Sequence, residues 1–140
     1  NPAFGPRIVA TLINPLENLA YSLARPVQQI ILRKAVINMT ATKLDELIEG
    51  GTEVQLIDVR TPLEYGRYHI KGTVNVPIHA ISAYMNRIDK EKPLVFICKS
   101  GFRGYLGAML ALTNGYDEAY NLLGGVDGGW RKAGLPTIWN

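Results

Sequence analysis

The most reactive side chain in this sequence of 140 residues is its single cysteine, Cys98. It follows the apolar run Leu94-Val95-Phe96-Ile97 and precedes Lys99-Ser100-Gly101-Phe102-Arg103. The apolar run has the length of a buried strand, and the residues after the loop have the pattern of a helix. A thiol placed between them lies among unpaired backbone amides at the positive end of that helix. The pattern therefore predicts a nucleophilic thiolate in an anion-binding loop.

Five residues after the cysteine are the candidate substrate-binding residues: Lys99, Ser100, Gly101, Phe102 and Arg103. Lys99 and Arg103 add positive charge, and the glycine permits a tight turn. A cysteine that merely ends a buried strand is more often an inert apolar residue. The glycine three positions on and the arginine five positions on favour the functional interpretation. A single cysteine forms no intramolecular disulfide, which is typical of a reducing, cytoplasmic location.

The elements that would position this loop alternate between strands and helices. Apolar strands are predicted at residues 54–59, 73–76, 94–97 and 119–123. Helices are predicted at 42–48 beginning with Thr42, after the capping box Thr61-Pro62-Leu63-Glu64, and at 80–88, 102–114 and 126–133. This alternation predicts an α/β fold, a doubly wound parallel sheet with helices on both faces. Ligands of such sheets bind beyond the carboxyl ends of the strands, where Cys98 lies.

Residues 1–38 have a different pattern and are predicted to form a helical appendage or connector beside a domain spanning residues 39–140. Asn14-Pro15-Leu16-Glu17 is typical of a helix start, and Val27, Ile30, Ile31 and Ala35 form an apolar stripe. The favoured interpretation is a helix packed on its own domain or on a neighbouring chain. A membrane-surface helix and a connector to an upstream fused domain or partner protein are the alternatives.

The charge and hydropathy of the chain indicate which classes of binding partner to expect. The formal net charge is +3, from 15 basic and 12 acidic residues spread along the chain. Nucleic-acid binding usually needs a clustered basic stripe, so the pattern favours small anionic substrates instead. The apolar stretch from Ile8 to Leu32 is interrupted by charges and prolines, so a membrane-spanning helix is not expected. Membrane contact is not expected either, because the polar face of this segment is only modestly basic.

From about Thr40 onward the chain resembles the rhodanese homology domain. The pieces that carry the resemblance are Leu56-Ile57-Asp58-Val59-Arg60, Glu64-Tyr65, His69-Ile70-Lys71-Gly72, Asn75-Val76-Pro77, Cys98 to Arg103, Gly124-Gly125, Trp130 and Ala133-Gly134-Leu135-Pro136. Each motif alone has low specificity, but the order and spacing of the motifs match the family.

The resemblance implies a sulfurtransferase that works through a persulfide on Cys98. The thiolate would take the outer sulfur of thiosulfate or of another persulfide and pass it to a thiophilic acceptor. The implied partners are a small-molecule sulfur donor and a thiol acceptor, without a cofactor or a metal. Asp58 and Arg60 are expected to support the loop by ion pairing, and Glu64 to serve the local helix cap or pair with Arg60. His69 is expected to be a structural hydrogen-bonding residue and Trp130 a core residue.

Two positions depart from the family pattern. Val126-Asp127-Gly128-Gly129 is one residue longer than the usual spacing between the double glycine and the tryptophan, and Gly104 replaces a small hydroxylic residue. Two other interpretations also fit the fold: a phosphatase or arsenate reductase, and a non-catalytic binding module. The phosphatases have one more residue between the cysteine and the arginine, and the modules often lack the cysteine. The six positions from Cys98 to Arg103 favour sulfur chemistry.

Overall fold

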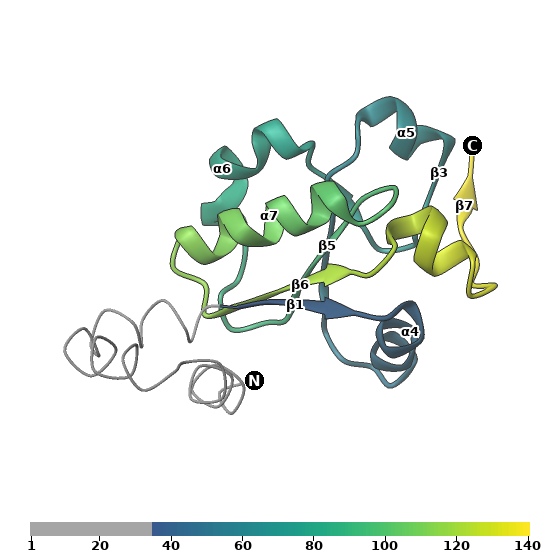
Figure 1. Ribbon diagram of the computed structural model, residues 1–140, viewed down its shortest axis with the longest axis horizontal. Coiled ribbons are helices and arrows are strands. Elements are labelled where there is room, and N and C mark those ends of the chain that lie inside the picture. Colours follow the sequence, from purple (N-terminus) through teal and green to yellow (C-terminus); the bar gives the residue numbers. More distant parts are fainter. Residues whose placement is uncertain (1–34) are drawn as a thin grey trace, which may run out of the picture. The chain divides into compact units, whose positions relative to one another are not determined.

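The computed structural model of the chain describes residues 35–140 (Figure 1). Most of the predicted helical segment 1–38 therefore lies outside the described residues. Its last four residues are extended rather than helical, because they belong to strand β1 (Ala35–Met39). The branched side chains of Val36 and Ile37 favour this conformation, and β1 lies at the edge of the sheet beside β6.

The main sheet has five strands in the order β1-β6-β5-β2-β4. The other four strands are β2 (Gln55–Asp58), β4 (Val74–Asn75), β5 (Leu94–Ile97) and β6 (Glu118–Leu122). Strand β2 pairs in parallel with both β4 and β5, and β5 pairs in parallel with β6. These four strands confirm the predicted strands to within two residues at either end. A small antiparallel sheet of β3 (Tyr68–His69) and β7 (Ile138–Trp139) was not predicted.

Helices cover both faces of the main sheet, which confirms the predicted doubly wound α/β fold (Figure 1). One face carries α7 (Phe102–Thr113) and α6 (Ile81–Tyr84), with the short 3₁₀ turns η1 (Ile78–Ala80) and η2 (Met85–Arg87) on either side of α6. The opposite face carries α4 (Ala41–Glu49) and the segment η3 (Gly125–Arg131). No helix within residues 35–140 is long and apolar enough to cross a membrane.

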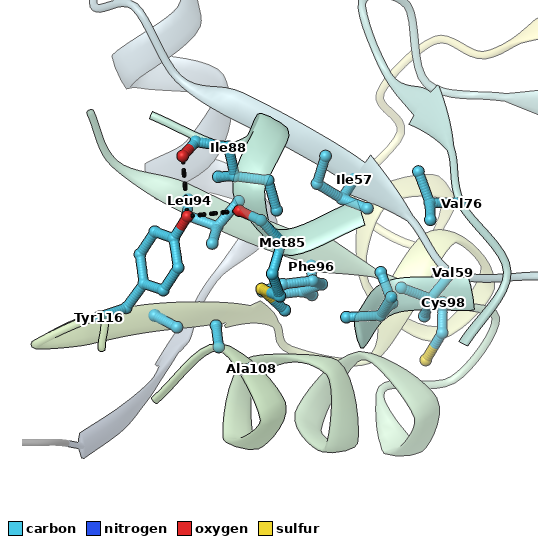
Figure 2. Packing of buried hydrophobic residues seen from close by; sticks show 13 residues of the cluster. Ile57, Val59, Val76, Met85, Ile88, Leu94, Phe96, Cys98, Ala108 and Tyr116 are labelled. Carbon is cyan, nitrogen blue, oxygen red and sulfur yellow. Dashed lines mark hydrogen bonds between the residues drawn. The ribbon is translucent and has the colours of Figure 1, made fainter. Parts of the chain in front are cut away.

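Strand β5 is buried on both sides, which explains its continuous apolar sequence. Leu94, Phe96 and Cys98 belong to the core cluster under α6 and α7 (Figure 2), whereas Val95 and Ile97 belong to the cluster under α4 and η3. All five residues are at most 1% exposed. Burial of each large aliphatic or aromatic side chain contributes about 1.5–3 kcal/mol, so β5 holds its carboxyl end, and Cys98 with it, in a fixed place.

Threonine caps in the sequence predict two helix starts. The capping box of α5 (Pro62–Arg67) is confirmed, because the Thr61 hydroxyl accepts the Glu64 N–H and the Glu64 carboxylate accepts the Thr61 N–H. The predicted start of α4 at Thr42 is wrong, because α4 begins one residue earlier, at Ala41. Thr40 is the cap, and its hydroxyl accepts the Lys43 N–H at 3.2 Å. The extended backbone needed at a cap is found at Thr40, which directly follows β1.

The predicted helix at residues 126–133 is a π-helix over Gly125–Arg131. A π-type turn holds one residue more than an α-helical turn, so it absorbs the extra residue between the double glycine and Trp130. Trp130 still reaches the core at 4% exposure, and its indole N–H donates to the Pro136 carbonyl at 2.7 Å. The longer turn therefore leaves the predicted core position of the tryptophan unchanged.

Candidate active site

Cys98 lies directly after β5, under the start of α7 (Figure 2). The residue is 1% exposed. The Gly101 backbone N–H donates to its Sγ at 2.9 Å. Gly101 has a φ of 106°, in the left-handed region that favours glycine, and the chain turns there into α7. The residues from Cys98 to Arg103 are called the cysteine loop below, and the Gly101 amide of this loop binds the buried sulfur.

Two carbonyl groups of the cysteine loop accept hydrogen bonds from the first turn of η3. The Val126 N–H donates to the Cys98 carbonyl at 2.7 Å, and the Asp127 N–H donates to the Lys99 carbonyl at 3.0 Å. A trans peptide directs its C=O and its N–H to opposite sides. The N–H groups of Lys99 and Ser100, which belong to these two peptides, therefore point away from η3. A side chain on Gly125 would overlap the Cys98 carbonyl and the Lys99 backbone. The sequence interpretation missed this role of residues 125–127.

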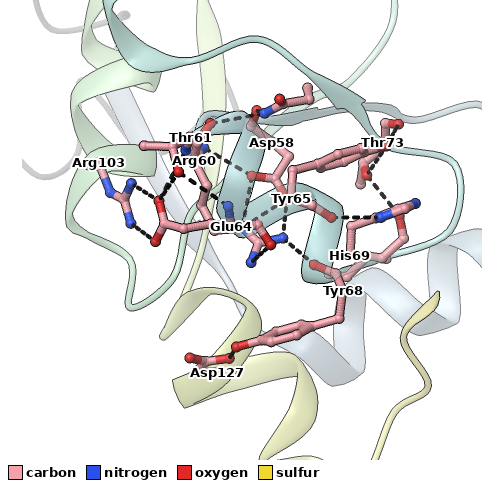
Figure 3. Close-up of polar contacts among 12 residues, drawn as sticks. Asp58, Arg60, Thr61, Glu64, Tyr65, Tyr68, His69, Thr73, Arg103 and Asp127 are labelled. Atoms are coloured by element: carbon pink, nitrogen blue, oxygen red, sulfur yellow. Dashed lines mark hydrogen bonds and ion pairs between the residues drawn. The ribbon is translucent and has the colours of Figure 1, made fainter. Parts of the chain in front are cut away.

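The side chains of the cysteine loop take different positions. Lys99 and Ser100 are exposed, and Phe102 is 73% exposed. Arg103 instead turns toward α5 and binds Glu64 with both terminal nitrogens, at 2.7 and 2.9 Å (Figure 3). Bidentate pairs of this kind fix the orientation of the guanidinium. The loop therefore presents Lys99 at its rim, while Arg103 ties the first turn of α7 to α5.

Glu64 is a site residue whose main partner the sequence interpretation missed. Its carboxylate serves the predicted helix cap, but its ionic partner is Arg103 rather than Arg60, whose contact with Glu64 is to the backbone carbonyl at 3.4 Å. The hydrogen bonds from Arg103 lower the pKa of Glu64 from 4.5 to about 2, with help from Thr61. In turn, Glu64 raises the pKa of Arg103 above its ordinary value. Both groups are charged at neutral pH.

The predicted pairing of Asp58 with Arg60 is present, deep in the domain. Arg60 donates to the Asp58 carboxylate through Nη2 at 2.8 Å and through Nε, and the same Nη2 donates to the Tyr68 carbonyl at 2.7 Å (Figure 3). Both residues are at most 1% exposed. Removing either partner would destabilise the fold strongly, because the other charge would be left buried and unpaired. These contacts brace the segment from β2 through α5 to β3. They support the cysteine loop indirectly, because that segment carries Glu64.

His69 lies in β3, away from the cysteine loop in the described hydrogen-bond network. Its Nδ1 is 3.0 Å from the Tyr65 carbonyl, and its ring stacks on the Tyr65 ring with centroids 4.0 Å apart (Figure 3). These are the contacts of the structural residue that the sequence predicted.

Glu64→Gln is expected to change how stability depends on pH. The folded-state pKa of Glu64 is depressed, so its ionised form stabilises the fold fully above its ordinary value of 4.5, and this contribution is lost as pH falls toward about 2. Near neutral pH, the free energy of unfolding of the wild type should be about 1 kcal/mol higher than that of the variant. The difference is this small because the ion pair is partly solvated. Urea denaturation across the acid range checks this. A difference that is the same at about pH 7 and about pH 3 contradicts the assigned pair.

Comparison with known proteins agrees with this geometry. A family model described as Rhodanese-like domain matches residues 40–132. A protein named sulfurtransferase from Allochromatium vinosum is 31% identical over 103 residues, which cover 74% of this chain and 95% of that protein. A thiosulfate sulfurtransferase GlpE from Actinobacillus pleuropneumoniae is 31% identical over 93 residues, covering 65% of this chain and 82% of the relative.

A solved structure gives the same result in three dimensions. The crystal structure of SSP1007 from Staphylococcus saprophyticus superposes with a TM-score of 0.61 and 30% identity, over 66% of this chain and 91% of that one. The matched family model spans four of the five strands of the main sheet, β2, β4, β5 and β6, together with the cysteine loop and η3. With its strand order, its cysteine after β5 and its matching relatives, this chain belongs to the rhodanese-like domain family.

Proposed function

We propose that this protein is a sulfurtransferase that moves sulfane sulfur from thiosulfate or a persulfide to a thiophilic acceptor through a persulfide on Cys98. The names of its relatives, sulfurtransferase and thiosulfate sulfurtransferase, support this proposal. In the first step, the Cys98 thiolate attacks the outer sulfur of the donor. The donor's sulfur–sulfur bond breaks, and its electron pair leaves with sulfite or with a thiolate. In the second step, the acceptor attacks the terminal sulfur on Cys98 and the Cys98 thiolate leaves.

The observation that carries this proposal is the tight enclosure of the Cys98 sulfur. Cys98 is 1% exposed, and in the loop of six positions the Gly101 N–H lies 2.9 Å from Sγ. A terminal sulfur is a single atom and can approach such a group end-on. A phosphoryl group must bring three non-bridging oxygens with it. The enclosure therefore favours sulfur transfer over phosphate hydrolysis.

The loop amides suit the intermediate. The terminal sulfur of a Cys98 persulfide is anionic, and preorganised backbone N–H groups at a helix N-terminus stabilise an anion without reorganising. Hydrogen bonds from η3 to the Cys98 and Lys99 carbonyls hold those peptides in one orientation before the substrate arrives. The fixed loop thus supplies donors, while Cys98 supplies the nucleophile.

Lys99→Ala is expected to change donor choice. Arg103 is engaged by Glu64, whereas Lys99 is exposed at the rim of the loop, where the sulfonate part of thiosulfate would lie. The variant should raise KM for thiosulfate by about fivefold, as expected for one partly solvated charge contact. The variant should use an organic persulfide, which has no sulfonate group, almost as well as the wild type does. Steady-state kinetics with both donors decide this, and an equal loss on both donors contradicts the assigned role.

Aryl phosphate hydrolysis distinguishes the two enzyme classes on this fold. The wild type is expected to turn over thiosulfate with cyanide as acceptor and to release negligible phosphate from an aryl phosphate, because a loop of six positions should crowd the phosphoryl oxygens. Cys98→Ser is the matched control, since a contaminating phosphatase would survive that substitution. Phosphate release that depends on Cys98 and matches sulfur transfer in efficiency would overturn the proposed function.

A further inference from the structure

One buried asparagine lies beside the segment that leads from Cys98 into α7. Asn121 lies in β6 at 3% exposure, opposite Phe96 of β5 in the sheet register. Its side-chain Nδ2 donates to the Asn38 Oδ1 of β1 at 3.0 Å. Its Oδ1 is the one buried side-chain nitrogen or oxygen atom without a hydrogen-bond partner within residues 35–140. An unpaired buried acceptor destabilises the fold, so a local role for this side chain is expected.

The space around Asn121 shows what the carboxamide does. A Cβ on Gly104, in the first turn of α7, would overlap the Asn121 Oδ1 and would lie 3.1 Å from the Phe96 carbonyl. A Cβ on Gly101 would lie 3.8 Å from the Asn121 Nδ2. The carboxamide therefore occupies the volume that a side chain at position 104 would need. The carboxamide lies on the side of Gly101 and Gly104 to which a Cβ atom on either glycine would point.

We infer that Asn121 is a positioning residue for Cys98, and that Gly104 and Asn121 act as one unit. The carboxamide, held by Asn38, sets how closely the first turn of α7 approaches the sheet. That distance fixes Gly101, whose N–H donates to the Cys98 sulfur. The other amides of the first turn, those of Phe102 to Gly104, move with it. The inference deepens the proposed sulfur transfer, because these amides would hold the terminal sulfur of the persulfide.

The unit makes a specific prediction about compensation. Asn121→Ala leaves a void under the loop, and Gly104→Ala forces a methyl group into the carboxamide. In the double variant Gly104→Ala with Asn121→Ala, the methyl group at 104 enters the space that the carboxamide has left. Contacting residues of this kind show non-additive effects. The double variant should therefore be more active than Gly104→Ala alone.

The rate at which iodoacetamide alkylates Cys98, the single thiol of the sequence, reports loop geometry without requiring sulfur transfer. Asn121→Ala and Gly104→Ala should each slow the alkylation of Cys98 about tenfold. Each should also lower kcat/KM with thiosulfate and cyanide about tenfold, because small misplacements of catalytic groups have effects of this size. The double variant should recover about fivefold over Gly104→Ala. Asn114→Ala, which removes an exposed asparagine at the far end of α7, is the matched control and should match the wild type.

Thermal denaturation separates positioning from a purely structural role. Lower melting temperatures with a wild-type alkylation rate in folded Asn121→Ala would overturn the inference, as would losses that simply multiply in the double variant. If Asn121→Ala does not fold, Asn121→Ser with Gly104→Ala provides the same comparison. Alkylation that follows the predicted pattern in a protein without sulfur transfer would sustain the positioning role and refute the proposed function.

Discussion

Cys98→Ser is expected to lose sulfur transfer by about a thousandfold or more, the scale seen when a covalent nucleophile is removed. A serine hydroxyl is a far weaker nucleophile than a thiolate at neutral pH, and no general base contacts position 98 in the described residues to activate it. The fold should survive, because oxygen for sulfur is a small change and the Gly101 N–H can donate to either atom. Turnover with thiosulfate and cyanide, measured beside thermal denaturation, tests both parts.

The serine variant must also stay folded for this result to count. A melting temperature within a few degrees of the wild type, with no turnover, supports Cys98 as the sulfur carrier. Substantial turnover in a folded serine variant would show that Cys98 is not the carrier.

Arg103→Ala is expected to lower kcat/KM by about ten- to a hundredfold, because it removes two charge-assisted hydrogen bonds that fix the start of α7. It also leaves Glu64, whose side chain is 29% exposed, without its ionic partner. Arg103→Lys should recover only part of the loss, since an ammonium group cannot bind both carboxylate oxygens in the same planar geometry. Steady-state kinetics of the two variants measure this difference.

A double-mutant cycle with Glu64→Gln identifies the cause of the Arg103 effect. If Arg103 acts through Glu64, the double variant should be little worse than Arg103→Ala alone. Losses that multiply would show that Arg103 acts on the substrate directly. A larger loss in Lys99→Ala than in Arg103→Ala, on thiosulfate and on an organic persulfide alike, would contradict the division of roles between the two cations.

Features set by local sequence were predictable. The run Leu94 to Ile97 is apolar on both faces, and it forms β5 with the predicted bounds. The capping box at Thr61 and Glu64 depends on residues three positions apart, and it is present as predicted. The cysteine loop follows from the same local order of strand, thiol, glycine and helix. Short-range signals thus located the nucleophile and its surroundings.

Features set by distant contacts were not predictable. Glu64 and Arg103 are 39 positions apart, and Asn121 contacts Asn38 across 83 positions, so only the fold brings these pairs together. Strands β3 and β7 have two residues each, too few for a periodic signal. The hydrogen bonds from η3 to the cysteine loop join backbone N–H and C=O groups, so no particular residue type in the sequence indicates them. The nucleophile could be found from the sequence, but the contacts that position it could not.

Intact-mass measurement of the wild-type protein after incubation with thiosulfate tests the central claim most directly. The proposed mechanism predicts a gain of the mass of one sulfur atom, located on Cys98 by fragmentation, removed by cyanide and absent in Cys98→Ser. A protein that turns over thiosulfate and cyanide without ever carrying this sulfur, or that carries it in the serine variant, would contradict a persulfide on Cys98.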